Sequence, residues 1–237
     1  ILKTRCLGHS DGSIQLNTSG GTGNYNYSWA HDPNLSASVA ANLSSGNYEV
    51  SVTDANGCLT IDTLSLTSPD PLRLMVDSSQ TAQVSCNGAA DGYFTLTYNQ
   101  SDDINPIGTA PYQWENNIAS GVESSVTQLA PGTYKVTLTD TKGCKDSLAV
   151  LIEEPDPLIA TFQVPEPPLC HGEPTAFNVD DIQGGNGQKL ADYSYFLDST
   201  TIGYRGDQTA SLFAGTHYIT VVDAKNCQYQ DSFLITS

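Results

Sequence analysis

The stretch LSSGNYEVSVTDANGC, residues 43–58, contains a leucine, a glycine, an alternating strand led by an aromatic residue, an aspartate and a cysteine. The same order returns as LAPGTYKVTLTDTKGC at 129–144 and as LFAGTHYITVVDAKNC at 212–227. In every copy the glycine follows the leucine by three positions, the aspartate follows the glycine by eight, and the cysteine follows the aspartate by four. A spacing that persists while the residues between it change is fixed by a fold, so the chain is an array of repeats.

The closing cysteines of these copies lie 86 and 83 residues apart, which is long enough for each repeat to be a small domain. Short alternating strands separated by glycine-rich turns are typical of immunoglobulin-like antiparallel β-sandwiches. We therefore predict an all-β chain of three tandem immunoglobulin-like domains joined in series as a rod. Two seams with paired prolines, at 68–72 and 154–158, place the domains at 1–69, 70–155 and 156–237.

Aromatic residues in each repeat predict how the sandwich is filled. Tyr25, Tyr27 and Trp29 alternate with polar residues, so they share one face of a strand and are expected in the core. Leu-x-x-Gly-x-Tyr before a strand is typical of a tyrosine corner, in which the phenol bonds back to nearby backbone. The third repeat places His217 where the others have that tyrosine, and Tyr195 where the others have a tryptophan.

Six cysteines fall into three pairs, one per repeat: Cys6 with Cys58, Cys86 with Cys144, and Cys170 with Cys227. Bridging within each repeat would let every domain close on itself identically, and we predict these three disulfides and an oxidising compartment. Buried free thiols are the alternative. Zinc does not fit, because there is no C-x-x-C and the four histidines do not recur at one repeat position.

Acidic residues outnumber basic ones by 26 to 9, giving a formal net charge of −17. Such a surface repels nucleic acid and anionic membranes, because few lysines and arginines are available to neutralise phosphate. No run approaches the roughly 18 apolar residues of a membrane-spanning helix. We therefore expect no nucleic-acid partner and no membrane insertion of this segment, which we interpret as an interior piece of a longer protein.

The recurring aspartates Asp54, Asp140 and Asp223 have two interpretations. Asp-x-x-Gly is typical of a turn in which the carboxylate accepts hydrogen bonds from the following backbone, and this is the favoured one. A calcium site is the alternative, with Asp11 and Asp91 of the Asp-Gly pairs as further ligands. No nucleophile elbow, catalytic carboxylate pair or phosphate-binding loop is present in the sequence, so we predict no enzyme activity and no cofactor other than a possible calcium ion.

A Tyr-x-Trp strand followed by Leu-x-x-Gly-x-Tyr-x-Val-x-Val-x-Asp-x-x-Gly-Cys resembles the SprB repeat of Bacteroidetes surface proteins. The resemblance covers all three repeats and is loosest in the third, which has Tyr195, His217 and Asn226 at three motif positions. It implies type 9 secretion, display on the outer cell surface, and a part in surface attachment and gliding motility. The implied partners are extracellular polysaccharide or a solid surface, reached through the parent adhesin, and other surface or motility proteins.

The resemblance also implies O-glycosylation at Asp-Ser/Thr-aliphatic triplets, with Thr63 and Ser147 as the candidate residues. Two other functions remain open at this point. The repeats could be a calcium-assisted glycan-binding module, or they could be accessory domains of a secreted enzyme.

Overall fold

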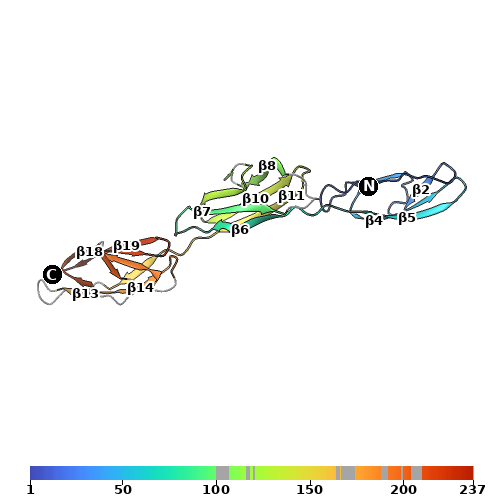
Figure 1. Cartoon of the computed structure of the whole chain (residues 1–237). Helices are drawn as coiled ribbons and strands as arrows, with labels where there is room; N and C mark the ends of the chain where they lie inside the picture. Colours follow the sequence, from blue (N-terminus) through green and yellow to red (C-terminus); the bar gives the residue numbers. More distant parts are fainter. Residues whose placement is uncertain are drawn as a thin grey trace. The chain divides into compact units, whose positions relative to one another are not determined.

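The computed structural model describes residues 1–99, 107–115, 118–119, 121–163, 166, 174–187, 192–198, 200–203 and 210–236. The regular elements in these ranges are β-strands, β1 to β19, and the strand pairs are antiparallel (Figure 1). The prediction of an all-β, immunoglobulin-like chain is confirmed. Within the same ranges no helix is long and apolar enough to cross a membrane.

The described residues cluster into two compact units. The first comprises 1–75, 96–124 and 135–148, and the second comprises 76–95, 125–134 and 149–237. Each unit therefore holds one complete end repeat together with part of the middle repeat. The division into three domains at 69/70 and 155/156 stays a prediction.

The first repeat contains two small sheets. One pairs β1 (Gly12–Gln15) with β3 (Val39–Leu43), and the other has the order β2-β4-β5, with β2 at Asn26–Trp29, β4 at Gly46–Thr53 and β5 at Leu59–Leu66. The register between β1 and β3 shifts by one residue beside Asn42, which has a positive φ of 56°. Beyond this bulge, Leu43 of the repeated motif pairs with Gly12.

The core of the first repeat lies between these two sheets. Trp29 is 1% exposed and packs with side chains from the other four strands of the repeat: Ile14, Ala40, Leu43, Val50 and Leu66. The indole Nε1 donates to the Ala37 carbonyl oxygen, at 3.0 Å, so the one polar atom of the buried ring is satisfied. Tyr27, two positions earlier on the same face, is half-buried, which confirms the expected alternation.

The middle repeat contributes two three-stranded sheets. One has the order β11-β10-β8, with β8 at Ile107–Trp114, β10 at Gly132–Asp140 and β11 at Lys145–Ile152. The other has the order β6-β7-β9, with β6 at Leu74–Ala82, β7 at Gly92–Tyr98 and β9 at Ser125–Leu129. Gln128, before the motif leucine, has a positive φ of 57° and repeats the conformation of Asn42.

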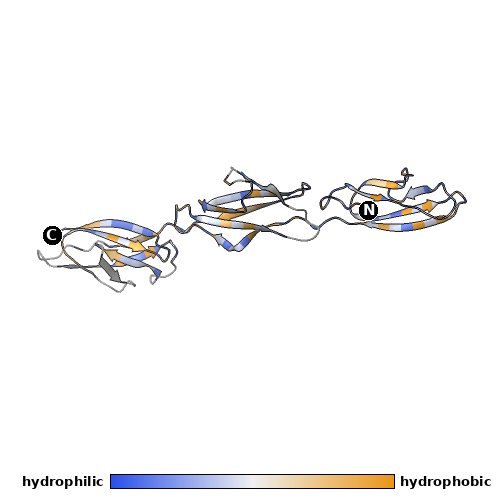
Figure 2. Ribbon diagram, turned by 45° about the horizontal axis from the view of Figure 1, so that its top comes forward, coloured by the Kyte–Doolittle hydropathy of each residue, from blue (hydrophilic) through white to orange (hydrophobic). Residues whose placement is uncertain are grey.

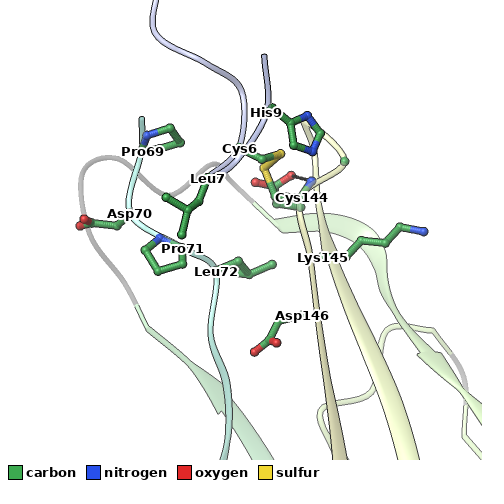
Figure 3. A pocket seen from close by; sticks show the side chains of 12 residues that line it. Cys6, Leu7, His9, Pro69, Asp70, Pro71, Leu72, Cys144, Lys145 and Asp146 are labelled. Atoms are coloured by element: carbon green, nitrogen blue, oxygen red, sulfur yellow. Dashed lines mark hydrogen bonds between the residues drawn. A yellow bond between two sulfur atoms is a disulfide. The ribbon is translucent and has the colours of Figure 1, made fainter. Parts of the chain in front are cut away.

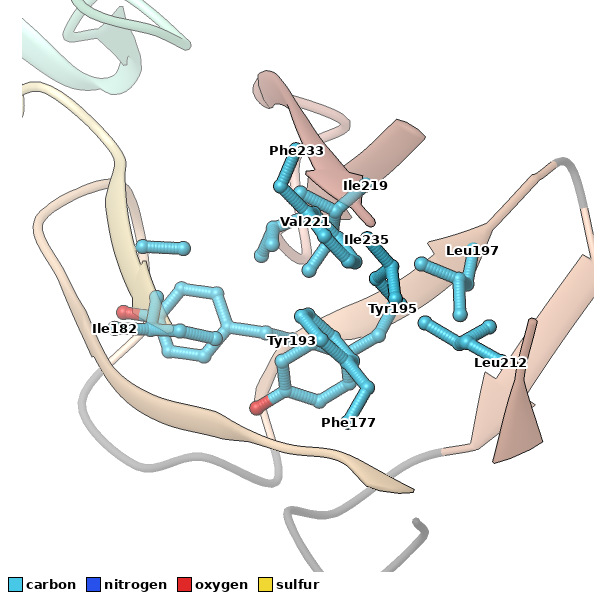
Figure 4. Close-up of a cluster of buried hydrophobic side chains, with 11 residues drawn as sticks. Phe177, Ile182, Tyr193, Tyr195, Leu197, Leu212, Ile219, Val221, Phe233 and Ile235 are labelled. Carbon is cyan, nitrogen blue, oxygen red and sulfur yellow. The ribbon is translucent and has the colours of Figure 1, made fainter. Parts of the chain in front are cut away.

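The third repeat pairs β12 (Ile159–Phe162) with β14 (Val179–Gln183) and β13 (Thr175–Phe177) with β17 (Ala210–Leu212). Its largest sheet has the order β16-β15-β18-β19, with strands at Thr200–Gly203, Ser194–Leu197, Gly215–Val222 and Gln228–Ile235. Phe177 and Phe233 stack at 4.7 Å in the core, and Tyr195 is 3% exposed among them (Figure 4). Tyr195 therefore fills the core as predicted.

Colouring by hydropathy shows hydrophobic and hydrophilic residues alternating along the strands of the repeats (Figure 2). In β10 the buried Val136 and Leu138 lie between less buried polar neighbours, and β18 repeats this pattern with Ile219 and Val221. This period of two is what places one face of each strand in the core.

Candidate functional site at the joints between repeats

Each repeated aspartate organises a closing turn, the name used here for residues 54–58, 140–144 and 223–227. Asp54 Oδ1 accepts hydrogen bonds from the amides of Asn56 and Cys58, at 3.0 and 2.8 Å. Asp140 and Asp223 do the same with the residues two and four positions later. The fourth residue of each turn has a positive φ, 82° at Gly57, 87° at Gly143 and 67° at Asn226, so the turn interpretation is confirmed.

The second carboxylate oxygen, Oδ2, also accepts a hydrogen bond in the first and third closing turns. Asp54 Oδ2 accepts from the Thr22 amide at 3.0 Å, and Asp223 Oδ2 accepts from the Asn186 amide at 2.7 Å. These donors hold the pKa of Asp54 below its ordinary value, the Thr22 amide most strongly. For Asp223, burial raises the pKa, but the hydrogen bonds from Asn186 and the turn amides outweigh it and the net pKa is lowered.

These carboxylates therefore serve as backbone acceptors. In the part of the chain that the structure describes, no three histidine, cysteine or carboxylate side chains gather as a metal site would require. Asp11 and Asp91 do not join the closing turn of their own repeat but bind the backbone amides of Arg5 and Ser85. Calcium binding stays a prediction that only a titration tests.

The first two repeats also have an opening loop, defined as residues 6–12 and 86–92, with the pattern Cys-x-Gly-x-x-Asp-Gly. The glycines at 8 and 88 have φ of 78° and 75°, and each cysteine carbonyl accepts from the amide three residues later. Asp11 Oδ1 accepts from the Arg5 amide and Asp91 Oδ1 from the Ser85 amide, both at 2.9 Å. The two loops thus share one geometry, in which the aspartate accepts a hydrogen bond from the amide of the residue before the cysteine.

Hydrogen bonds from Arg5 and Ser85 hold the pKa of Asp11 and Asp91 below their ordinary values. Their role is to fix the backbone beside the cysteine. The corresponding part of the third repeat, including Cys170, lies outside the described residues.

The disulfides connect successive repeats. Cys6 is bonded to Cys144 and Cys86 to Cys227, with Cα–Cα distances of 5.6 and 5.5 Å. Each bridge therefore joins the opening loop of one repeat to the closing turn of the next. The predicted pairs Cys6–Cys58, Cys86–Cys144 and Cys170–Cys227 are all wrong, because Cys6, Cys86, Cys144 and Cys227 are bonded otherwise. Cys58 is a free, exposed thiol.

Strand direction gives the physical reason for this correction. Gly12, at the end of the first opening loop, pairs with Leu43, and Gly46 then starts β4 at the same end of the repeat. β4 is eight residues long, which is about 25 Å at the rise of a strand, and Cys58 follows its far end. A disulfide needs Cα atoms within roughly 7 Å, so the two cysteines of one repeat cannot meet.

The first joint lies within the first compact unit. A cavity of about 480 Å³ beside the Cys6–Cys144 bridge is lined by Leu7, by the seam Pro69–Leu72 and by Lys145 and Asp146 (Figure 3). Leu7 points toward Pro71 and Leu72, and Asp146 Oδ2 accepts from the Leu74 amide at 2.6 Å. Consecutive repeats are thus held by two covalent connections, the seam and the disulfide.

The second joint lies within the second unit and has more hydrogen bonds. Asn87 Nδ2 donates to the Pro155 carbonyl oxygen at 3.1 Å, and the Gly88 amide donates to Glu154 Oε2 at 2.8 Å. On the other side of the bridge, Asn186 Nδ2 donates to the Ser85 carbonyl oxygen at 2.7 Å. Polar contacts therefore fix the opening loop of the middle repeat on both sides of the disulfide.

All three corner positions make the predicted backbone bond. The hydroxyls of Tyr48 and Tyr134 donate to the carbonyl oxygens of Ser44 and Ala130, both at 2.7 Å. His217 Nε2 lies 2.8 Å from the Phe213 carbonyl oxygen, so the histidine occupies the tyrosine's place with the same four-residue span. The corner is kept in the third repeat.

The candidate glycosylation residues lie on exposed strand positions. Thr63 in β5 and Ser147 in β11 are both exposed, and Ser147 Oγ forms a 2.8 Å hydrogen bond with Thr137 Oγ1. Their modification stays a prediction.

Residues 4–32, which span the opening loop, β1 and β2 of the first repeat, match the family model of the SprB repeat. This part of the chain is similar to the SprB repeat. A search of curated proteins found no match. The SprB repeat and the disulfides together indicate an extracellular or surface protein.

Several solved multidomain structures are similar to this chain. The fibronectin(III)-like modules of Clostridium thermocellum CbhA share 15% identity, over 69% of this chain and 94% of that chain, with a TM-score of 0.30. Extracellular domains 3–5 of Drosophila OTK share 9% identity, over 100% and 94%, with a TM-score of 0.31. Titin domains I67–I69 share 13% identity, over 98% and 93%, with a TM-score of 0.34.

Proposed function

We propose that this chain is a stalk segment of a large secreted adhesin, displayed on the outer surface of a Bacteroidetes cell and used in attachment and gliding. Its task is to transmit tension between the cell and an adhesive part of the parent protein, which contacts polysaccharide or a solid surface. The observation that supports this function is the bridging of successive repeats, because a disulfide at a joint carries force that a single seam would otherwise carry alone.

The bridges shorten the covalent path through the chain. The shortest path runs from the N-terminus to Cys6, across to Cys144, back along the chain to Cys86, across to Cys227 and on to the C-terminus. It contains residues 1–6, 86–144 and 227–237, about 76 residues, so the oxidised chain can extend to about 260 Å, against about 830 Å for the reduced chain of 237 residues. A stalk built in this way resists lengthening even after a repeat unfolds.

Other features suit the same function. The formal charge of −17 keeps neighbouring stalks apart, since like-charged surfaces repel. Type 9 secretion and glycosylation at Thr63 and Ser147 belong to this proposal, and they are supported by the SprB-repeat match at residues 4–32.

Force spectroscopy on the full chain, held at its two ends, tests the mechanical part. We expect a maximum extension near 260 Å under oxidising conditions and near 830 Å after reduction. An oxidised chain that lengthens as far as the reduced one would contradict the proposal.

Cell attachment tests the biological part. In cells that display the parent protein, Cys6→Ser with Cys86→Ser should leave surface display unchanged and lower the shear stress that detaches the cells. Unchanged detachment with normal display would argue against a tension-transmitting stalk. Binding of the isolated chain to polysaccharide, lost on calcium chelation, would instead favour a glycan-binding module.

A further inference from the structure

Cys58 is the one closing-turn cysteine of the three that has no disulfide partner among the described residues. It is exposed, whereas its counterparts Cys144 and Cys227 are each bonded to the opening loop of the preceding repeat. The same position thus forms a covalent bond in two repeats and is free in the first. The end of the first repeat that carries Cys58 therefore corresponds to the ends of the other two repeats that are bonded at a joint.

The surroundings of Cys58 match those of an occupied joint. The Cys58 amide donates to Asp54 Oδ1 and the Asp54 amide donates to the Cys58 carbonyl, as between Cys227 and Asp223. A pair of glycines with positive φ precedes Thr22, whose amide donates to Asp54 Oδ2, and the same arrangement precedes Asn186 at Asp223. The accepting half of a joint is therefore already formed at Cys58.

Contacts that Gly184 and Asn186 make at the second joint have no counterpart at Gly20 and Thr22 among the described residues. A Cβ added at Gly184 would lie 1.9 Å from the Pro157 carbonyl oxygen of the seam, whereas one added at the equivalent Gly20 would meet nothing within 4 Å. Asn186 donates to the Ser85 carbonyl oxygen, which belongs to the preceding repeat, while the bonds of Thr22 to Asp54 and Asn56 lie within its own repeat.

We propose that Cys58 accepts an inter-repeat disulfide from the opening cysteine of another SprB-type repeat. The partner is recognised as a cysteine at the start of a Cys-x-Gly-x-x-Asp-Gly loop, or a variant of it, that seats on the 54–58 turn and the 20–22 loop. The inference deepens the proposed function by naming a coupling site, but it concerns bond formation and not what the parent protein adheres to.

The geometry of the occupied joints explains why an opening loop fits. The carbonyl oxygen of the residue before the opening cysteine lies against the closing sulfur, 3.3 Å from Arg5 to Cys144 and 3.2 Å from Ser85 to Cys227. Asp11 and Asp91 fix that carbonyl by binding the amide of the same residue. A thiol outside such a loop would lack this fixed approach.

The bond forms by thiol–disulfide exchange with a low-molecular-weight disulfide such as oxidised glutathione. The partner cysteine attacks oxidised glutathione, forming a mixed disulfide and releasing one reduced glutathione. The Cys58 thiolate then attacks the partner's sulfur, the S–S bond to glutathione breaks, and a second glutathione leaves as thiolate and takes up a proton. Two protein thiols are oxidised and one oxidised glutathione is reduced, so electrons and atoms balance.

Two full-chain variants test the pairing in a glutathione redox buffer. The Cys170→Ser chain keeps Cys58 as an acceptor, and the Cys58→Ser chain keeps Cys170. Cys170 opens the third repeat with the variant sequence Cys-His-Gly-Glu-Pro-Thr, which keeps the glycine but lacks Asp-Gly, and it lies outside the described residues. We expect a one-to-one covalent product only when the two chains are mixed, with Cys58 linked to Cys170 in a non-reducing peptide map. Cys58–Cys58 dimers from the acceptor chain alone, or no product on mixing, would overturn the proposal.

A matched control tests whether the partner's opening loop must bind the closing turn or whether any exposed thiol reacts. The acceptor chain with Cys58→Ser and Thr60→Cys carries an exposed thiol two residues away, outside the closing turn. We expect the mixed product to form at least about tenfold more slowly with this control, because its thiol cannot meet a seated loop. Equal rates for the two acceptors would mean that any exposed thiol suffices, and would refute the site.

The parent protein isolated from cells, with thiols blocked at lysis, distinguishes the two sources of the partner. A Cys58 peptide bridged to an upstream repeat of the same polypeptide, or to Cys170 of a second copy, supports the proposal and names the source. A Cys58 that is a blocked thiol throughout would overturn it, and would leave the force-extension result of the stalk proposal unaffected.

Discussion

His217 lies between two acceptors: Nδ1 is 2.6 Å from Asp198 Oδ2, and Nε2 is 2.8 Å from the Phe213 carbonyl oxygen. Because a carboxylate and a carbonyl oxygen both accept hydrogen bonds, the ring satisfies both only when each nitrogen carries a proton. The first two corners use a neutral tyrosine hydroxyl at this position. The third corner is therefore held by a charge, and it responds to pH.

The third repeat should lose stability as the pH rises above neutrality. Burial lowers the pKa of His217, but the hydrogen bonds to Asp198 and Phe213 and the carboxylate charge outweigh it and raise the net pKa. A raised folded pKa gives stability that is complete below the unfolded value of about 6.5 and is lost as the pH rises through the folded pKa. Hydrogen exchange of the β18 amides between pH 6 and 9 should show weaker protection at the higher pH.

Two substitutions at the same corner serve as controls. His217→Tyr keeps the bond to the Phe213 carbonyl without a titrating group, so the pH dependence of β18 protection should disappear. His217→Phe removes both hydrogen bonds and should destabilise the repeat by about 2 kcal/mol at pH 6. If the pH dependence persisted in the tyrosine variant, another group would be responsible.

Substitution of the cysteines separates the observed bridges from pairing within a repeat. With the middle repeat folded, the Cys6–Cys144 bridge and the seam at 69–72 hold both ends of the first repeat's chain. Cys144→Ser should therefore lower the free energy of unfolding of the first repeat by about 4 kcal/mol, although Cys144 lies in the middle repeat.

Cys58→Ser supplies the contrast, because it lies in the first repeat and forms no bridge among the described residues. Calorimetry should find its melting temperature unchanged under conditions that keep the chain monomeric. A loss at Cys58 as large as the loss at Cys144 would indicate pairing within the first repeat instead.

Asp223 should be a large single contributor to the third repeat. Its carboxylate accepts from the amides of Lys225 and Cys227 on one oxygen and from Asn186 on the other. Asp223→Ala should destabilise the repeat by about 3 kcal/mol, measured by urea unfolding, because three backbone amides lose a charged acceptor. Asp223→Asn should restore part of the loss, since its amide oxygen can still accept from the turn.

Acid gives an independent test of the same carboxylate. The pKa of Asp223 is lowered in the folded chain, so its contribution is present above the unfolded pKa of about 3.9 and is lost as the pH falls through the folded value. The Asp223→Asn variant should show a weaker acid destabilisation than the native chain. An identical acid profile would assign the acid response to other carboxylates.

The sequence predicted those features that depend on local spacing. The eight residues from Gly46 to Asp54 fit one strand, and an aspartate four residues before a cysteine fits one turn. Tyr48 lies at the start of that strand, close to the leucine of the motif. Each involves groups a few residues apart, where backbone geometry leaves few solutions. The corner at His217 was also open to prediction, because imidazole can donate a hydrogen bond as a phenol does.

The disulfide pairing could not be obtained from spacing, because the repeat symmetry allows two solutions. Pairing within a repeat and pairing with the next repeat both give nearly constant separations, and the observed ones are 138 and 141 residues. The antiparallel direction of β4, which carries the closing cysteine to the far end from the opening loop, decides between them. That signal was present in the sequence as the strand between Gly46 and Asp54.

Gly20 and Gly184 occupy equivalent positions in the first and third repeats, two residues before Thr22 and Asn186. Gly20 and Gly184 both have positive φ, 88° and 74°, so alanine at either position costs about 1–2 kcal/mol in backbone strain. Only at Gly184 would the new Cβ meet the Pro157 carbonyl oxygen of the seam, so Gly184→Ala should cost at least about 1 kcal/mol more than Gly20→Ala in urea unfolding.

The same pair of variants reports on the joint at Cys58. Once an opening loop is bonded to Cys58 and its seam packs at Gly20, the Gly20→Ala variant should form the covalent product less readily than the native chain. A Gly20→Ala chain that couples as well as the native chain would mean that the seam of the partner does not approach Gly20 as Pro157 approaches Gly184. In that case the coupled joint at Cys58 would differ in geometry from the joint at Cys227.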